Sequence, residues 1–235
     1  MKAMIFAAGR GERMRPLTDT CPKPLLKVRG RPLIVWHILN LVRAGFTDII
    51  INHAHLGHMI EATLGTGEQF GARIVYSAEG TALETAGGIA HARHLLGEEP
   101  FLALASDIYC PHFDFSQTKN VLEDCDVWGK PHPLHQRDVA WLYLVKNPTH
   151  NPQGDFALHS FSIANEGEPH LTFSGIGVYR PSMFDGIADG ESAKLAPLLR
   201  EYAARGQVGG EFFRGDWSDI GTPERLAELN AQLNK

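Results

Sequence analysis

Several features are scarce in this sequence of 235 residues, and each scarcity excludes a class of protein. It holds only three cysteines (Cys21, Cys110 and Cys125), an odd number without a CxxC spacing. A small secreted domain held by disulfides needs an even set, so we expect a reducing, cytoplasmic environment. Long apolar runs are also scarce, and the one near the N-terminus is too short for a signal peptide or a membrane span. We therefore expect no membrane association.

Basic charge is scarce as well. The chain has 22 Lys and Arg residues against 27 Asp and Glu residues, which gives a formal net charge of −5. Without a basic excess, nucleic acid is a poor candidate partner, although a small anion needs only a local positive pocket. The remaining composition is ordinary, with 43% hydrophobic residues. A chain of this length and composition can bury a sizeable core as one domain.

The first half alternates short apolar runs with amphipathic segments. We expect strands at residues 3–8, 48–52, 73–77 and 101–105, and helices at residues 32–44, 58–64 and 87–96. This alternation, with short connections, predicts an α/β fold whose mostly parallel central sheet has helices on both faces. Ligands of such sheets bind beyond the carboxyl ends of the strands. Here those ends carry Gly9, Asn52, Glu79 and Asp107.

After about residue 115 the pattern changes. We expect longer strands at residues 139–145 and 171–179, a short strand at 217–220, and helices at 192–205 and 223–233. The last helix is expected to pack back on the sheet. Residues of roughly 115–180 are interpreted as a substrate-side lobe of the same domain.

The most informative segment follows the first predicted strand. Residues 7–15 read Ala-Ala-Gly-Arg-Gly-Glu-Arg-Met-Arg. Two glycines allow close approach of the backbone to a ligand, and consecutive N–H groups in such a loop form a concave anion site. The same segment and its continuation carry four cations: Arg10, Arg13, Arg15 and Lys23. That density of positive charge suits a triphosphate, whereas the plain alternative is a Gly-rich turn with solvated arginines.

Other phosphate-binding loops fit this segment less well. The dinucleotide fingerprint needs a third glycine where Met14 stands. The P-loop needs Gly-Lys-Ser/Thr directly before a helix, but Lys23 is flanked by prolines.

The loop, together with Pro-Lys-Pro-Leu at residues 22–25, resembles the signature of the sugar-1-phosphate nucleotidylyltransferases, also called sugar-nucleotide pyrophosphorylases. The resemblance extends to Glu-Thr-Ala-Gly-Gly at residues 84–88, to Ser106-Asp107, and to Trp-Ser-Asp-Ile-Gly-Thr-Pro-Glu at residues 217–224. It therefore covers nearly the whole chain. Within the family, the chain is most similar to the short bacterial N-acetylmuramate-1-phosphate uridylyltransferases, which share its size and stretches such as Asn-Pro-Gln-Gly-Asp-Phe.

The resemblance implies a fold, an activity and a setting. The fold is a Rossmann-like, mixed and mostly parallel sheet of the nucleotide-diphospho-sugar transferase type. Residues 1–115 would form the nucleotide-binding half, 115–180 the sugar-side lobe, and 181–235 the closing helices with the second metal aspartate. The activity would be transfer of UMP from UTP to a sugar 1-phosphate such as N-acetylmuramic acid 1-phosphate, in cytoplasmic cell-wall recycling. A monomer or a small homo-oligomer is expected.

The resemblance also implies residue roles. Catalysis would involve Lys23, Arg13 and Asp107. Nucleotide binding would involve Ala8, Gly9, Gly11, Glu12, Arg13, Lys23, Glu79, Gly80, Gly87 and Gly88. Sugar binding would involve Asp155, Ser174 and Gly175. Asp107 and Asp219, both at strand–turn junctions, would hold Mg²⁺, which takes few carboxylates and completes its shell with water and phosphate oxygens. Single carboxylates at such places can also simply cap the next turn, and the Gly87-Gly88 pair can simply open a helix.

One departure from the family pattern keeps alternatives open. The family has glycine just before the first aspartate, where this chain has Ser106. A non-catalytic sensor that keeps the fold is therefore one alternative, and a mannose- or heptose-1-phosphate guanylyltransferase is another.

Histidines do not change this interpretation. His53, His55 and His58 cluster, and His132 and His135 follow prolines, but none has the spacing of a zinc site. We expect them in surface loops.

Overall fold

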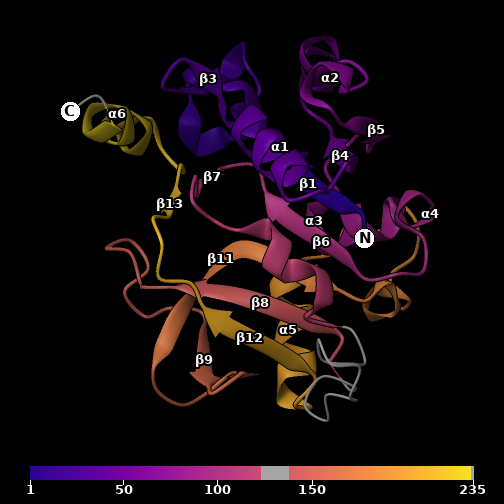
Figure 1. The fold of residues 1–235 in the computed structure, drawn as a ribbon, viewed down its shortest axis with the longest axis vertical. Coiled ribbons are helices and arrows are strands. Elements are labelled where there is room, and N and C mark those ends of the chain that lie inside the picture. Colours follow the sequence, from indigo (N-terminus) through magenta and orange to yellow (C-terminus); the bar gives the residue numbers. More distant parts are fainter. Residues whose placement is uncertain (123–137, 234–235) are drawn as a thin grey trace.

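The computed structural model describes residues 1–122 and 138–233, and in this part of the chain helices cover both faces of a nine-stranded mixed sheet (Figure 1). The sheet strands are β1 (Ala3–Ala7), β4 (Asp48–His53), β5 (Arg73–Ala78), β6 (Phe101–Ala105), β8 (Ala140–Val145), β9 (Phe156–His159), β10 (Ser162–Ala164), β11 (His170–Tyr179) and β12 (Val208–Phe212). The helices are α1 (Leu33–Arg43), α2 (Gly57–Leu64), α3 (Glu84–His91), α4 (Arg93–Leu96), α5 (Leu195–Ala204) and α6 (Pro223–Leu233).

The order of strands in the sheet is β5-β4-β1-β6-β11-β8-β12-β10-β9. The first four of these are parallel to one another, and β11 joins them antiparallel to β6. β9 also pairs back with the start of β11. The predicted mixed, mostly parallel α/β fold is therefore confirmed for the N-terminal half, and the residues of the second lobe continue the same sheet.

Alternate residues of the central strands face two different helix layers. Ile5 of β1 packs with residues of α1 and α2, whereas its neighbour Met4 packs with residues of α3, α4 and α5. The same alternation holds in β4, where Ile49 and Ile51 face the first layer and Ile50 the second. Continuous apolar runs are the expected sequence of strands buried on both faces.

Two small antiparallel pairs complete the fold. β2 (Lys27–Val28) pairs with β3 (Arg31–Pro32), and β7 (Ile108–Tyr109) pairs with β13 (Ser218–Asp219). Leu229 of α6 packs into a third apolar cluster with residues of the β2–β3 region, and Figure 1 shows α6 beside that hairpin. The expectation that the last helix packs on the central sheet was therefore wrong, because the apolar residues that it covers lie in and around the hairpin.

Most predicted elements match the observed ones within a few residues. The helix expected at residues 87–96 begins earlier, at Glu84, and is interrupted at Ala92 before α4. β12 was not predicted, because its central pair, Gly209 and Gly210, has low strand propensity. There is no room for a side chain at Gly210: a Cβ would lie 2.5 Å from the Leu142 carbonyl oxygen.

Some predictions concern residues outside the described ranges. His132 and His135, and part of the expected 115–180 lobe, lie there. Of the other histidines, His53 is buried at the end of β4, with its Nε2 2.7 Å from Glu61 Oε1. Within the described residues, no helix is long and apolar enough to cross a membrane.

Replacement of Phe101 should destabilise the sheet strongly. Its side chain is fully buried, and its ring centroid lies 5.9 Å from that of Tyr179 and 6.2 Å from that of Phe184. We expect Phe101→Ala to lower the free energy of unfolding by about 3–5 kcal/mol in urea denaturation. Phe161→Ala is the matched control, because Phe161 is 52% exposed, and it should change the value by less than about 1 kcal/mol. Equal effects of the two changes would contradict this assignment of the core.

Candidate active site

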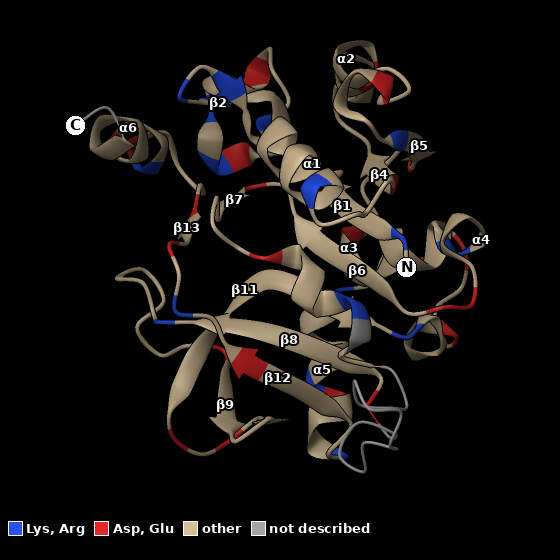
Figure 2. Cartoon of the chain, viewed as in Figure 1, with Lys and Arg blue, Asp and Glu red and all other residues tan. Residues whose placement is uncertain are grey.

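A cavity of about 560 Å³ opens at the carboxyl ends of β1, β4 and β6. Its lining comes from residues 6–14 at the end of β1 and in the loop that follows, from Lys23 and Pro24, from residues 84–85 at the start of α3, and from residues 105–107 at and beyond the end of β6. This is the edge of the sheet at which the sequence predicts a ligand site. Figure 2 shows basic segments around the nearby β2–β3 hairpin.

The loop after β1 forms one wall and leaves its backbone accessible. A Cβ at Gly9 would meet no atom within 4 Å, so the glycine leaves open space beside the chain. Gly11 has a φ of 66°, in the left-handed region, and a Cβ there would lie 3.0 Å from Thr18 Cγ2. The Thr18 hydroxyl donates a 2.8 Å hydrogen bond to the Gly11 carbonyl. Ala8 and Glu12 line the same wall.

Three of the four predicted cations line this cavity, namely Arg10, Arg13 and Lys23. Arg15 does not, and its Nε lies 3.3 Å from Asp19 Oδ1. The Lys23 side chain is only 11% exposed, and its Nζ donates to Asp107 Oδ2 at 2.5 Å. Because an ammonium has three N–H donors, Lys23 keeps two of them for a ligand.

A short antiparallel pairing brings together the backbones of the two predicted metal aspartates. Asp219 of β13 lies opposite Ile108 of β7, the residue next to Asp107. The Ile220 N–H donates a 2.7 Å hydrogen bond to the Asp107 carbonyl. The two backbones therefore lie side by side, although they are far apart in the sequence.

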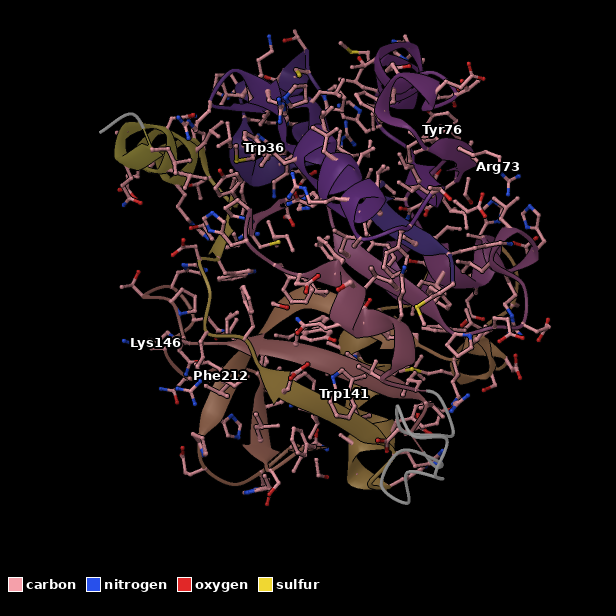
Figure 3. All side chains as sticks on the ribbon, in the orientation of Figure 1. Trp36, Arg73, Tyr76, Trp141, Lys146 and Phe212 are labelled. Carbon is pink, nitrogen blue, oxygen red and sulfur yellow. The ribbon has the colours of Figure 1, made fainter. Side chains whose placement is uncertain are left out.

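The Asp219 carboxylate has two cationic partners. Its Oδ1 lies 2.9 Å from His150 Nε2, and its Oδ2 accepts a hydrogen bond from Arg225. These three residues line a second, smaller hollow of about 250 Å³. Lys146 lines it too and projects from the molecule at the end of β8 (Figure 3).

The donor chemistry of this pair fits Mg²⁺. Carboxylate oxygens are the ligands that Mg²⁺ prefers, and it usually takes one or two of them together with substrate phosphates and water. Within residues 1–122 and 138–233 no group of three or more His, Cys, Asp or Glu residues could hold a metal. Asp219 does not line the phosphate-loop cavity, and both of its carboxylate oxygens face cationic partners, so a Mg²⁺ ion shared between Asp107 and Asp219 stays a prediction.

A buried histidine supports the strand next to Asp107. His37 of α1 is 2% exposed and forms a hydrogen bond with the backbone of Ile108. Burial lowers the pKa of His37 to about 4, against the opposing effects of that hydrogen bond and of the Asp107 charge. The imidazole is therefore neutral near pH 7 and adds no charge beneath the acidic pair.

Glu79, predicted to lie against the nucleobase, is instead used in internal hydrogen bonds. Its Oε1 accepts from Asn52 Nδ2 at 2.6 Å, and its Oε2 accepts from the Leu83 N–H at 2.8 Å. Glu79 does not line the cavity, whereas Asn52 does. The neighbouring Gly80 has a φ of 68° and open space around it.

The two glycines of α3 are buried and allow close packing. A Cβ at Gly87 would lie 2.2 Å from the Glu191 carbonyl oxygen, and one at Gly88 would lie 2.5 Å from Glu79 Oε1. Neither glycine lines the cavity defined by the described residues. Their contact with a nucleobase stays a prediction.

The residues predicted to bind the sugar lie along and beside β11. Asp155 accepts a 2.8 Å hydrogen bond from the Phe173 N–H, and the carbonyl of the buried Ser174 accepts one of 2.9 Å from Trp217 Nε1. Gly175 has a φ of 82° in the bulge of β11. None of Asp155, Ser174 and Gly175 lines the phosphate-loop cavity, and their role toward a sugar stays a prediction.

Four residues around the site had no predicted role. Glu84 lines the cavity with a φ of 61°, and Asn52 lines it from the end of β4. Arg225 and His150 contact Asp219. Two of them carry a signal in the sequence: Asn52 is a polar residue at the end of an apolar strand, and Glu84 begins the Glu-Thr-Ala-Gly-Gly stretch of the family resemblance. Arg225 and His150 depend on contacts between distant segments.

Ser106, the departure from the family pattern, lines the cavity next to Asp107 and is 5% exposed. Its N–H donates a 3.1 Å hydrogen bond to the Phe6 carbonyl, which continues the pairing of β1 with β6. The cavity therefore accommodates the extra Cβ and hydroxyl without loss of the strand geometry.

Comparisons with known proteins agree with this geometry. The family model described as nucleotidyl transferase matches residues 2–125. The chain is 51% identical to an N-acetylmuramate alpha-1-phosphate uridylyltransferase of Neisseria meningitidis, over 98% of this chain and 97% of the relative. It is 33% identical to the Caulobacter vibrioides protein of the same name, over 98% and 96%. A mannose-1-phosphate guanyltransferase beta-A of Xenopus laevis is 32% identical over 95% of this chain but only 62% of its own length.

A solved structure supports the fold. The Bacillus anthracis protein, assigned as a glucose-1-phosphate thymidylyltransferase, superposes with a TM-score of 0.81 at 22% identity, over 99% of this chain and 94% of that one. The family match covers more than half of the chain, and two relatives are at least 33% identical over nearly the whole of both chains. The chain therefore belongs to the nucleotidyl transferase family.

Proposed function

We propose that this protein transfers UMP from UTP to N-acetylmuramic acid 1-phosphate, with release of pyrophosphate. The proposal is supported by 51% identity with the Neisseria uridylyltransferase along nearly the whole of both chains. The observation that carries it is the Lys23–Asp107 pair, which lies in the cavity wall beside the phosphate loop. A cation and a carboxylate at one point suit a reaction in which phosphates and a metal must meet.

The chemical problem in this reaction is electrostatic. A sugar 1-phosphate is already an ionised oxygen nucleophile, so no strong general base is needed. Its oxygen forms a bond to the α-phosphorus of UTP, and the bond from that phosphorus to the β-phosphate oxygen breaks. Pyrophosphate leaves with the electron pair, so both partners and the leaving group are anions. Positioning and cationic stabilisation therefore determine the rate.

The residues of the cavity divide this work. Lys23 would donate its two free N–H groups to the phosphates at the reacting centre. Arg13 and the amides of Gly9 and Gly11 would hold the β- and γ-phosphates. Asp107 and Asp219 would hold Mg²⁺, which would supply positive charge to stabilise the phosphates.

The setting follows from the same proposal. The product, a nucleotide-activated amino sugar acid, belongs to peptidoglycan recycling, and we place the enzyme in the cytoplasm, where UTP is available. Two described cysteines, Cys21 and Cys110, are free thiols, which suits a reducing compartment. A monomer or small homo-oligomer remains our expectation.

A substrate panel tests the proposed reaction directly. The purified protein is incubated with Mg²⁺, each of the four common nucleoside triphosphates, and the 1-phosphates of N-acetylmuramic acid, mannose and heptose, and pyrophosphate release is measured. We expect release to be fastest with UTP and N-acetylmuramic acid 1-phosphate. A preference for GTP with mannose or heptose 1-phosphate would replace the proposal with a guanylyltransferase. No release with any pair would favour a non-catalytic sensor.

Removal of the Lys23 charge should reduce turnover with little effect on folding. We expect Lys23→Met to lower kcat by about 10²–10³-fold, because an aligned cation that stabilises transition-state charge contributes that much. Lys27→Met is the matched control, since Lys27 is exposed on β2, and it should retain wild-type kcat. Thermal unfolding of both variants checks the fold. Near-normal pyrophosphate release by Lys23→Met would refute the assigned role.

Substitution of Asp219 should raise the Mg²⁺ concentration that turnover requires. We expect Asp219→Asn to raise the Mg²⁺ concentration for half-maximal turnover by about tenfold or more, as loss of one of two carboxylate ligands should. Asp216→Asn is the control three residues earlier, because Asp216 has an 82% exposed side chain and faces His112. An unchanged Mg²⁺ dependence in Asp219→Asn would show that Asp219 does not hold the metal.

A further inference from the structure

Three hydrogen bonds in series connect the two walls of the nucleotide cavity. The Ala7 N–H, where the phosphate loop begins, donates to Asn52 Oδ1 at 3.0 Å. Asn52 Nδ2 donates to Glu79 Oε1 at 2.6 Å, and Glu79 Oε2 accepts from the Leu83 N–H at 2.8 Å. Leu83 directly precedes α3, whose first residues line the opposite wall. We call Asn52 and Glu79 the wall bridge.

The wall bridge needs one amide and one carboxylate in this order. At its two ends are backbone N–H groups, which can only donate. Asn52 therefore accepts at one end with its oxygen and donates onward with its nitrogen. Glu79 receives two donors, one on each oxygen, so an ionised carboxylate satisfies both and a neutral amide cannot do so with separate atoms. The charge at Glu79 thus has a structural use within the bridge.

Burial makes the bridge geometry strict. Asn52 is 2% exposed and Leu83 is 9% exposed, so water is not a ready substitute partner at these two residues, whereas Glu79 between them is half-buried. Gly88 of α3 lies against the bridge, and a Cβ there would lie 2.5 Å from Glu79 Oε1 and 2.7 Å from Asn52 Nδ2. The second glycine of the Gly87-Gly88 pair therefore makes space for the bridge.

We propose that Asn52 and Glu79 are positioning residues, which hold the phosphate loop and the start of α3 at the spacing that a nucleoside triphosphate requires. This inference rests on the proposed function for its ligand, because a nucleotide must contact both walls at once. Glu79 would then act without touching the nucleobase. Its two oxygens already have partners, and it does not line the cavity.

Single substitutions should break the bridge in a predictable way. In Glu79→Gln, the new side-chain amide has one oxygen and one NH₂ group. Whichever way it is turned, its NH₂ group faces another donor, either the Asn52 NH₂ group or the Leu83 N–H. In Asn52→Asp, a carboxylate oxygen faces Glu79 Oε1 where a donor is needed. We expect each change to weaken UTP binding by about tenfold, measured by calorimetry with UTP and MgCl₂, because a buried polar group loses its partner. The KM for the sugar 1-phosphate should change by less than about twofold, within the scatter of unperturbed sites.

The double variant Asn52→Asp/Glu79→Gln should restore the bridge with the charge moved. The new carboxylate at position 52 accepts from the Ala7 N–H and from the new amide at position 79, and the oxygen of that amide accepts from the Leu83 N–H. We expect UTP affinity to return to within about threefold of wild type, which additive single effects would not allow. A residue that only read the base would not be rescued by a change at position 52.

Hydrogen–deuterium exchange tests the bridge without any ligand. Peptides that contain Ala7 and Leu83 should exchange faster in each single variant and regain protection in the double variant. Asp48→Asn is the control, because Asp48 begins the strand that carries Asn52 and its ion pair with Arg73 is exposed. It should leave exchange at Ala7 and Leu83, and UTP affinity, unchanged.

The outcomes separate the two proposals. Rescue of both UTP affinity and amide protection supports positioning by the wall bridge. The positioning proposal is overturned if the double variant binds UTP as weakly as the product of the two single-variant losses predicts and its amide exchange at Ala7 and Leu83 stays fast. If the wild-type protein does not bind UTP, the proposed function fails, while exchange at Ala7 and Leu83 still decides whether the bridge joins the two walls.

Discussion

The parallel pairing of β1 between β4 and β6 is the constraint on which the rest of the site depends. It places the ends of three strands at one edge of the sheet, so the phosphate loop, Asn52 and Asp107 all reach the same cavity. Each strand is buried on both faces by helices, which leaves this edge as the place where polar groups can meet a ligand. The short pairing of β13 with β7 places the backbone of Asp219 beside that of Asp107, although the Asp219 side chain lines the second hollow.

Three charged residues at the two hollows, Lys23, Asp107 and Asp219, have ion-pair partners within the protein. Lys23 lies against Asp107, and Arg225 and His150 lie against Asp219. Such pairing keeps a half-buried carboxylate from standing alone, which would be unfavourable. The two sets of pairs lie at different hollows, Lys23 with Asp107 at the phosphate-loop cavity and Asp219 with Arg225 and His150 at the second one. The neutral His37 beneath β7 supports this arrangement without changing its charge.

Many elements of the fold could be predicted because their signals are local. The apolar run of β1 and the helical spacing of α1 each lie within one segment of sequence. β12 could not be predicted, since its glycines are favoured by close neighbours rather than by strand propensity: Trp141 lies against Gly209, and the Leu142 carbonyl lies against Gly210. The start of α3 was misplaced because Glu84 adopts a left-handed conformation, which short side chains and glycine usually take. Both differences, at β12 and at the start of α3, result from packing between segments, which no local sequence pattern records.

What the sequence by itself determined is the chemistry of the phosphate loop and the class of fold. Glycines and cations within one short stretch act together wherever the chain places them, and alternating apolar runs leave few alternatives to a sheet covered by helices. Tertiary structure alone decided which carboxylates face the ligand. Glu79 and Asp107 both end apolar strands, yet Glu79 is turned inward onto Asn52 and Leu83 while Asp107 lines the cavity with Lys23. The reason is that the half-buried Glu79 carboxylate accepts from the donors around it, and the Asn52 amide is supplied by a neighbouring strand that lies 27 residues away in the sequence.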